Sequence, residues 1–326
     1  MLEPRRRLSV VTMGEILVQL NSVTTGPLRH VNYFEKHAAG AEANFAVGIS
    51  RMGFHAGFIG RVGADEFGTY LLSVLKAEGV DTSRVVVDQE APTGVYFIQR
   101  SYPVPEKSSV LYYRKGSAGS RLSPDDVEIE YVRGCELFHI TGITFALGES
   151  GCEAGYKAVQ EARRGGAKVS LDTNIRLKLW KAERAKEVLR PVLSMADIVF
   201  TDPDDSEILL GERDPETIIT SMLGMGVSTA VVKLGEEGAV AGTRQEQARV
   251  QAIKVPVEDI IGAGDAFASC FSASIMRGES LQRALEVANA AGALVVMVRG
   301  DIENLPTPAD LQRFMESQRK GRVVYR

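Results

Sequence analysis

The chain has 326 residues, of which 44% are hydrophobic and 25% charged, and its formal net charge at pH 7 is -4. This composition is typical of a globular protein, and the mild negative charge argues against general binding to nucleic acid or anionic lipid. Three scattered cysteines and four scattered histidines exclude a disulfide scaffold or a zinc finger. The longest apolar run, 290–298, is too short to span a bilayer. We expect a cytoplasmic protein of about two domains, or one large α/β domain with an insertion.

Short β-branched runs alternate with segments of helical period in the first half of the chain, which is the pattern of parallel βαβ units. The expected elements are a strand opening at Val10, a helix over 42–52, a strand over 56–59, a helix from Asp65 to Gly79, a helix after Ser123-Pro124, a strand over 137–141 and a helix ending at Arg164. Ser150 and Glu153 have the spacing of a capping box at the start of that last helix.

The second half repeats this alternation. We expect strands over 169–171, 198–200 and 230–233, helices over about 182–195 and 215–224, and final helices beginning near Gly262, Ser280 and Thr307-Pro308. The pattern predicts a mostly parallel central sheet.

One region departs from the alternation. Two strand-like runs, 94–100 and 110–114, are joined by a proline-containing loop with no helix between them, which predicts an antiparallel pair. A further strand over 16–20 could join them in a small sheet, built from about 15–35 and 93–116, that projects as a lid. Its tyrosines and arginines suggest a ligand surface, although half-buried strands favour Tyr and Phe in any case. Tyr113 should face opposite to Tyr112 because strand side chains alternate.

The strongest local signal is Gly262-Ala263-Gly264-Asp265 at the start of an amphipathic helix. Small residues there let an anion approach the unpaired N–H groups at the positive end of the helix dipole. Asp265, in the first turn, could accept the proton of an attacking hydroxyl, and the helix terminus should favour its ionised form. The alternative is a tight turn followed by an acidic residue that only complements the dipole. The spacing does not match a dinucleotide-binding fingerprint.

Together with the stretch Ala-Gly-Ala-Glu-Ala-Asn-Phe-Ala at 39–46, then Gly53 and Gly63, the Gly-Ala-Gly-Asp segment resembles the two signatures of the PfkB, or ribokinase-like, carbohydrate kinases. The resemblance covers essentially the whole chain and implies a single domain over 1–326, with three α/β/α layers, a mostly parallel central sheet and a small β-sheet lid. Two departures stand out. Glu42 replaces a usually small residue, and Ile260-Ile261 replaces the usual Thr-Thr, whose hydroxyls could contact phosphate or metal.

Within that family the chain is most similar to the members that phosphorylate 2-keto-3-deoxygluconate. The similarity rests on the motifs at 112–120, 171–180, 201–205 and 299–301. It implies Asp265 as the base and sugar contacts from Gly40, Asn44, Tyr96, Tyr112, Arg114, Arg176 and Asp301. The chemistry agrees, because a guanidinium binds the carboxylate of an acidic sugar in a forked geometry and tyrosines can cover its carbon skeleton. The alternatives are that Arg114 and Tyr112 are solvated lid residues and that Asp301 only orders the 299–300 turn.

The strand over 231–234 and the turn after it resemble the family's ATP site, which would lie at the carboxyl ends of the strands. The implied nucleotide contacts are Asn174, Lys233, Gly235, Glu236, Gly238 and the anion hole of Gly262, Ala263 and Gly264. The 235–238 segment could equally be an ordinary hairpin turn. Asp202 and Asp205 could bind Mg²⁺ through water, or they could simply begin a solvated helix. A monovalent-cation requirement stays open.

We therefore expect ATP-dependent, Mg²⁺-assisted phosphorylation of the terminal hydroxyl of 2-keto-3-deoxygluconate, and of its C4 epimer if the site tolerates one inverted hydroxyl, under a lid that excludes water. One alternative is a fructokinase or ribokinase in which Arg114 pairs with a neighbouring carboxylate. Another is a non-catalytic sugar-binding module, against which an intact Asp265 argues. Exposed lid-strand edges favour a homo-oligomer.

Overall fold

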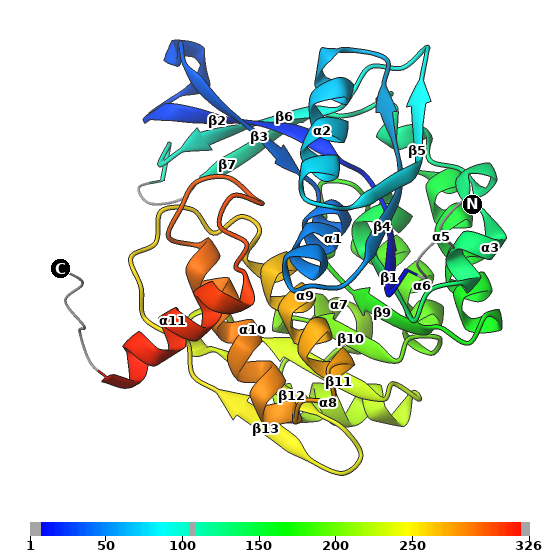
Figure 1. The fold of residues 1–326 in the computed structure, drawn as a ribbon, viewed down its shortest axis with the longest axis vertical. Helices are drawn as coiled ribbons and strands as arrows, with labels where there is room; N and C mark the ends of the chain where they lie inside the picture. The colour runs from blue at the N-terminus through cyan, green and yellow to red at the C-terminus, as the bar shows by residue number, and fades with distance from the viewer. Residues whose placement is uncertain (1–7, 105–107, 321–326) are drawn as a thin grey trace, which may run out of the picture.

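Two β-sheets organise the computed structural model, which describes residues 8–104 and 108–320 (Figure 1). The larger sheet has nine strands. In spatial order they are β13 (Gln247–Val250), β12 (Ala239–Gly242), β11 (Thr229–Lys233), β10 (Ile198–Thr201), β9 (Lys168–Asp172), β8 (Leu137–Thr141), β1 (Val10–Met13), β4 (Ala56–Gly63) and β5 (Asp81–Asp88). Only the β11–β12 and β12–β13 pairings are antiparallel, so the prediction of a mostly parallel sheet is confirmed.

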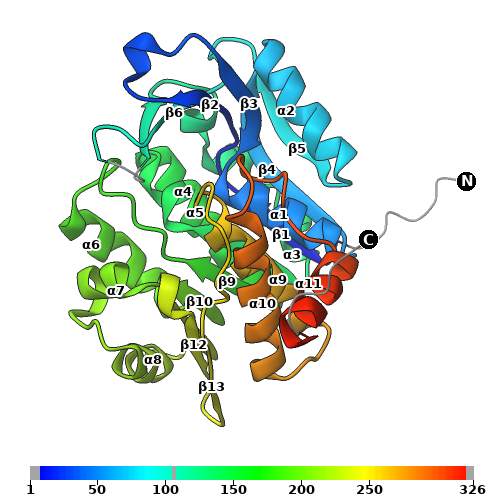
Figure 2. The same ribbon diagram turned by 90° about the vertical axis from the view of Figure 1, so that its left-hand side faces the viewer.

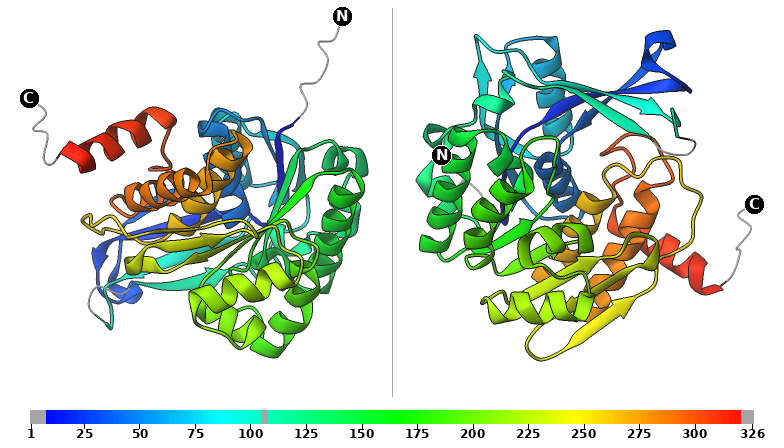
Figure 3. Two further views of the ribbon diagram at one scale, coloured as in Figure 1. Left: turned by 90° about the horizontal axis from the view of Figure 1, so that it is seen from below. Right: turned by 180° about the vertical axis from the view of Figure 1, so that it is seen from behind.

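Helices cover both faces of this sheet, which gives three layers (Figure 3). On one face lie α1 (Ala41–Arg51), α2 (Glu66–Ala77), α9 (Ala263–Met276), α10 (Leu281–Val295) and α11 (Pro308–Lys320). On the other lie α3 (Ile129–Arg133), α4 (Gly142–Ala146), α5 (Glu149–Arg164), α6 (Ala182–Leu193), α7 (Pro203–Leu210) and α8 (Pro215–Gly224). None of these described helices is both long and apolar enough to span a bilayer.

Each face of the sheet has its own hydrophobic core, because strand side chains alternate between the faces. Val10 packs in one core with Phe45 and Phe271, whereas its neighbour Val11 packs in the other with Phe138. All four residues of β1 are buried, as expected for a central strand covered by helices on both sides. The two cores hold the strand ends at fixed positions beneath the site described below.

A second sheet has four strands in the order β3 (Phe34–Ala39), β2 (Leu17–Thr25), β6 (Val95–Arg100) and β7 (Ser109–Tyr113). Figure 2 shows it above one end of the larger sheet. The predicted antiparallel pair is confirmed as β6–β7, and the further strand as β2. Because β3 pairs with β2 as far as Ala39, the small sheet extends beyond residue 35, where the predicted segment stopped.

Two local predictions were wrong. Helix α5 begins at Glu149 after Gly148, whose φ of 141° favours glycine, so Ser150 is not its capping residue. A capping box is found instead at Ser123 and Asp126, where it begins a short 3-10 turn and not the full helix we expected. Strands β3, β5 and β13 were also missed, because polar residues interrupt their apolar pattern.

Candidate active site

The amino end of α9 faces two other segments of the chain. Gly262 caps the helix with a φ of 81°, and a Cβ there would lie 3.0 Å from Oδ1 of Asp301. A Cβ on Gly264 would lie 3.5 Å from Nζ of Lys233. Small residues therefore let the 299–301 loop and the end of β11 approach the first turn, whose N–H groups lack partners within the helix. This arrangement fits the predicted anion hole at 262–264.

Asp265 lies in that first turn and is oriented by a neighbouring helix. Nδ2 of Asn44, in α1, donates a hydrogen bond of 2.7 Å to its Oδ2. Burial raises the pKa of Asp265 to about 7, although Asn44, Lys233 and Arg176 oppose the shift. Desolvation makes the largest contribution to this shift, and the predicted preference of the helix terminus for the ionised form stays a prediction. A carboxylate with a pKa near neutrality is well matched to accepting a proton from a hydroxyl.

Asp301 and Tyr96 extend this group toward the small sheet. The Tyr96 hydroxyl donates to Oδ2 of Asp301 at 3.1 Å and accepts from Nε2 of Gln19 at 2.7 Å. Burial and the nearby Asp265 raise the pKa of Asp301 well above its usual range. The 299–300 turn is held separately by Glu303, which accepts from the Asp301 N–H at 2.9 Å. The Asp301 carboxylate is thus directed toward Tyr96, and ordering the turn is not its only role.

Arg114 is buried, not solvated, and it contacts a carboxylate. Its Nη2 lies 2.6 Å from Oε2 of Glu15, and its guanidinium lies over the ring of Tyr112 at 4.9 Å. The Tyr112 and Tyr96 rings are 5.3 Å apart, which connects Arg114 to the Asp301 group. Arg114 is only 8% exposed, and its Nε has no hydrogen-bond partner among the described residues. Tyr113 lies on the opposite face of β7 and is 62% exposed, as predicted.

Lys233 and Asp172 form a second ion pair, at the carboxyl ends of β11 and β9, in which the lysine side chain is 21% exposed and the aspartate side chain is buried. Nζ of Lys233 donates to Oδ2 of Asp172 at 2.6 Å. Burial lowers the pKa of Lys233, but the Asp172 carboxylate more than offsets this and the net shift is upward. Oδ1 of Asp172 is buried without a hydrogen-bond partner among the described residues. The raised pKa keeps Lys233 protonated close to the first turn of α9, with its charge balanced by Asp172.

The segment after Lys233 is a hairpin turn, which agrees with the alternative prediction for residues 235–238. It joins β11 to the antiparallel β12, with Gly235 at a φ of 56° and Gly238 at 100°. A Cβ on Gly238 would overlap the backbone at the end of β13, which pairs with β12, so the turn itself requires this glycine. Gly235 and Glu236 are exposed and available to a ligand. Their nucleotide contacts stay predictions.

Asp202 and Asp205 begin a helix. Asp202 caps α7 by accepting from the Asp205 N–H at 2.8 Å. Oδ2 of Asp205 accepts from Thr173 at 2.6 Å and from the Ile175 N–H at 3.0 Å, so it fixes the loop that contains Asn174. No group of three or more His, Cys, Asp or Glu side chains in the described part of the chain could hold a metal ion. A metal here would depend chiefly on ligands from a phosphate and water.

Two further residues predicted to contact the sugar, Gly40 and Arg176, differ in their structural surroundings. Gly40 caps α1 with a φ of 145°, and a Cβ there would overlap the carbonyl oxygen of Glu15, so this position requires glycine. Arg176 is exposed in the loop after β9, and its charge lowers the pKa of Asp265. Arg176 therefore acts on Asp265 through its charge, and its predicted sugar contact stays a prediction.

Three carboxylates in or beneath the site were not among the predicted residues: Glu15, Asp172 and the side chain of Glu42. Glu15 lies two residues after the end of β1, and Asp172 is the last residue of β9. An acidic residue at the carboxyl end of a buried strand was the signal that could have identified both. Glu42 is accommodated because Gly14 leaves space for it and the hydroxyls of Thr141 and Thr144 donate to it at 2.7 and 2.5 Å.

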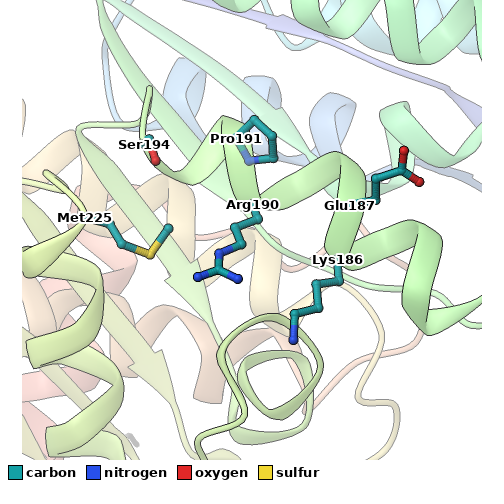
Figure 4. Close-up of a pocket in the computed structure, with 6 residues that line it drawn as sticks. All are labelled: Lys186, Glu187, Arg190, Pro191, Ser194 and Met225. Carbon is teal, nitrogen blue, oxygen red and sulfur yellow. The ribbon is translucent and has the colours of Figure 1, made fainter.

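Two surface cavities differ in their relation to this site. One of about 550 Å³ lies along α6 and is lined by Lys186, Glu187, Arg190, Pro191, Ser194 and Met225, none of them a site residue (Figure 4). The other, of about 620 Å³, is lined by residues that include Tyr112, Arg114, Lys115 and Lys178. The second cavity therefore opens onto the Arg114 end of the site.

Comparison with known proteins agrees with this geometry. Residues 7–308 match the family described as pfkB family carbohydrate kinase. A 2-dehydro-3-deoxygluconokinase from Thermoproteus tenax is 48% identical over 95% of both chains, and one from Bacillus subtilis is 36% identical over 96% of this chain and 97% of its own. An E. coli protein assigned as ribokinase II, solved in complex with ATP and Mg²⁺, has a TM-score of 0.89 and is 30% identical, over 95% of this chain and 99% of its own. The chain belongs to the pfkB family of carbohydrate kinases.

Proposed function

We propose that this kinase transfers the γ-phosphoryl group of ATP to the terminal hydroxyl of 2-keto-3-deoxygluconate, also called 2-dehydro-3-deoxygluconate, to give the 6-phosphate. The two relatives named for that activity support the substrate. The observation that carries the proposal is the buried guanidinium of Arg114, linked through Tyr112 and Tyr96 to the Asp265 group. Arg114 already contacts Glu15, and the carboxylate of a keto-deoxy acid would give its Nε, which has no hydrogen-bond partner among the described residues, a further anionic acceptor that a neutral sugar lacks.

Asp265 supplies the chemistry at the hydroxyl. The carboxylate accepts the hydroxyl proton while the sugar oxygen forms its bond to the γ-phosphorus and the bond to ADP breaks. Asn44 holds one carboxylate oxygen, which leaves the other directed to the substrate. Base catalysis of this kind contributes about 10²- to 10⁴-fold to a rate.

At the end of the site where the phosphoryl group would be transferred, main-chain N–H groups and the side chain of Lys233 would bind phosphate. The N–H groups of Gly262, Ala263 and Gly264 would stabilise the negative charge on the transferred group, with Lys233 nearby. Asn174, Gly235, Glu236 and Gly238 would contact the nucleotide. The partly exposed Asp202 fits a water-mediated place beside Mg²⁺, which when bound neutralises phosphate charge, whereas Asp205 is already occupied by its own loop.

At the sugar end, Arg114 would bind the carboxylate, with Arg176 adding longer-range attraction, and Tyr96 and Tyr112 would cover the carbon chain. Asn44, Asp301 and the backbone at Gly40 would contact the hydroxyls. The four-stranded sheet would close as a lid over the sugar and exclude water. A homo-oligomer formed through its strand edges and a cytoplasmic location stay predictions.

A substrate panel tests this function. With ATP and Mg²⁺, ADP release would be measured for 2-keto-3-deoxygluconate, its C4 epimer, ribose, fructose and 3-deoxyfructose, in which a CH₂OH group replaces the carboxylate. We expect kcat/KM for the keto-deoxy acids to exceed that for 3-deoxyfructose by about tenfold to a hundredfold, the contribution of one charge-assisted contact. Equal values for the acid and its neutral counterpart would overturn the assigned substrate.

One observation favours a second candidate, a kinase of neutral sugars. Arg114 already has a carboxylate partner in Glu15, as the fructokinase or ribokinase alternative requires. If Glu15 is the permanent partner, Arg114→Ala will change KM equally for acidic and neutral sugars. If the substrate carboxylate binds Arg114, only the acidic sugars will lose affinity.

A further inference from the structure

Glu15 connects the two sheets at the sugar end of the site. It lies between β1 and β2, so its backbone joins the larger sheet to the small one, and the residue is only 2% exposed. Its Oε2 contacts Arg114 at 2.6 Å, and its Oε1 accepts from Ser117 at 3.2 Å. A Cβ on Gly119 would lie 2.9 Å from Oε1, so the loop after β7 packs directly on this carboxylate.

The charges around Glu15 are unequal. Arg114 and Ser117, from the loop after β7, stabilise its ionised form, whereas burial and the negative charge of Glu42, from α1, oppose it. Burial has the largest effect and raises the pKa of Glu15 to about 7. Among the described residues, Arg114 is the cation that contacts Glu15, and its charge is the largest influence that favours the ionised form. Any group that competes for this guanidinium will favour protonation of Glu15.

We propose that Glu15 is a positioning residue that occupies Arg114 in the empty site and takes up a proton when the carboxylate of the substrate binds the same guanidinium. This inference rests on the proposed function, because it needs an anionic sugar. The Nε of Arg114, buried without a hydrogen-bond partner among the described residues, gives the incoming carboxylate a donor that Glu15 does not use. The proton comes from solvent and adds to the Glu15 carboxylate, so no bond of the substrate changes.

The physical consequence is a linkage between pH and affinity. Two carboxylates sharing one guanidinium in a buried site cannot both stay ionised without a large cost. Below pH 7 Glu15 is already protonated in the free enzyme, and binding requires no further proton. Above pH 7 each binding event takes up about one proton, so the Kd of the acidic sugar rises roughly tenfold per pH unit. The Kd of 3-deoxyfructose, which has no carboxylate, does not follow this trend.

Calorimetry on the wild-type enzyme tests the linkage directly. Binding of 2-keto-3-deoxygluconate would be titrated at pH 8 in phosphate and in Tris, whose different ionisation enthalpies give the number of protons exchanged. We expect uptake of about one proton for the acid and none for 3-deoxyfructose. Asp265→Asn is the matched control for the other carboxylate with a pKa near neutrality, and uptake should persist in it. Uptake lost in Asp265→Asn would assign the proton to Asp265 and overturn the inference.

Glu15→Gln provides the second test, since glutamine imitates the protonated side chain in shape and charge. In this variant proton uptake should disappear, and the Kd at pH 8 should fall about tenfold, to the wild-type value near pH 6. Binding of the acid without proton uptake by the wild type would overturn the role of Glu15 but leave the proposed function intact. Absence of any binding of the acid, with 3-deoxyfructose or fructose bound, would overturn both.

Discussion

The two cation–carboxylate pairs of the site have the same contact distance but different surroundings. Lys233–Asp172 and Arg114–Glu15 both meet at 2.6 Å. The first joins two strand ends of the nine-stranded sheet, whereas the second joins the larger sheet to the loop that follows β7 of the small sheet. In the proposed function, Lys233–Asp172 lies in the part that serves phosphoryl transfer and Arg114–Glu15 in the part that contacts the sugar. The proposal therefore assigns chemistry and substrate choice to separate parts of the fold.

Removing the base should have the largest effect. In Asp265→Asn the amide cannot accept the hydroxyl proton, so we expect kcat to fall about 10³-fold while the KM of the sugar changes little. Initial rates of ADP release, with sugar binding measured separately by calorimetry, check this. A kcat within tenfold of wild type would show that another group is the base.

Breaking the Lys233 pair should cost stability. Lys233→Met leaves the buried Asp172 carboxylate without its cation, and we expect the free energy of unfolding to fall by about 3 kcal/mol in urea denaturation. The matched variant is Arg114→Met, which should cost less, because Glu15 has a pKa of about 7 and can become neutral by taking up a proton. Equal losses in the two variants would remove the distinction between the two pairs.

Arg114→Ala should affect acidic substrates only. Loss of a charge-assisted contact predicts a KM for 2-keto-3-deoxygluconate about tenfold to a hundredfold higher, with kcat largely kept and with little change for 3-deoxyfructose. Steady-state kinetics with both sugars measures the difference. A parallel rise in both KM values would favour the neutral-sugar kinase.

The pH dependence of kcat should report Asp265. Burial raises its pKa in the free enzyme to about 7, and only the ionised carboxylate can accept a proton, so kcat should be constant at high pH and fall about tenfold per unit below the pKa that Asp265 has in the substrate complex. A profile at saturating sugar and ATP from pH 5 to 9 measures this. Glu15→Gln should keep the same profile, because Glu15 acts on binding. A kcat that stays constant down to pH 5 would contradict the assignment.

The smallest effect is expected where β3 contacts the 299–303 loop. Nδ1 of His37 lies 2.6 Å from Oε1 of Glu303, and this hydrogen bond, partly opposed by burial, raises the pKa of His37. The stabilisation is therefore fully present below pH 6.5 and is lost as the pH rises through the folded-state pKa. His37→Gln should lower the free energy of unfolding by under about 1 kcal/mol at pH 6 and leave it unchanged at pH 9. The same loss at both pH values would exclude an ionic contribution.

The sequence by itself determined the alternation of strands and helices, the small residues at 262–264 where α9 begins and the position of Asp265 in its first turn. These features depend on residues close together in the chain, where periodicity and glycine are informative. It also indicated which residues of β6 and β7 face the same side, because side chains alternate along a strand.

Only the tertiary structure decided the charges and partners of the site. The pKa of Asp265 depends on burial against distant segments, and the partner of Arg114 is a glutamate about a hundred residues away, across two sheets. Asp205, a candidate near the metal, proved to be held by Thr173 and Ile175. Local sequence cannot reveal such features, because desolvation and ion pairing are set by what packs around a group and not by its neighbours in the chain.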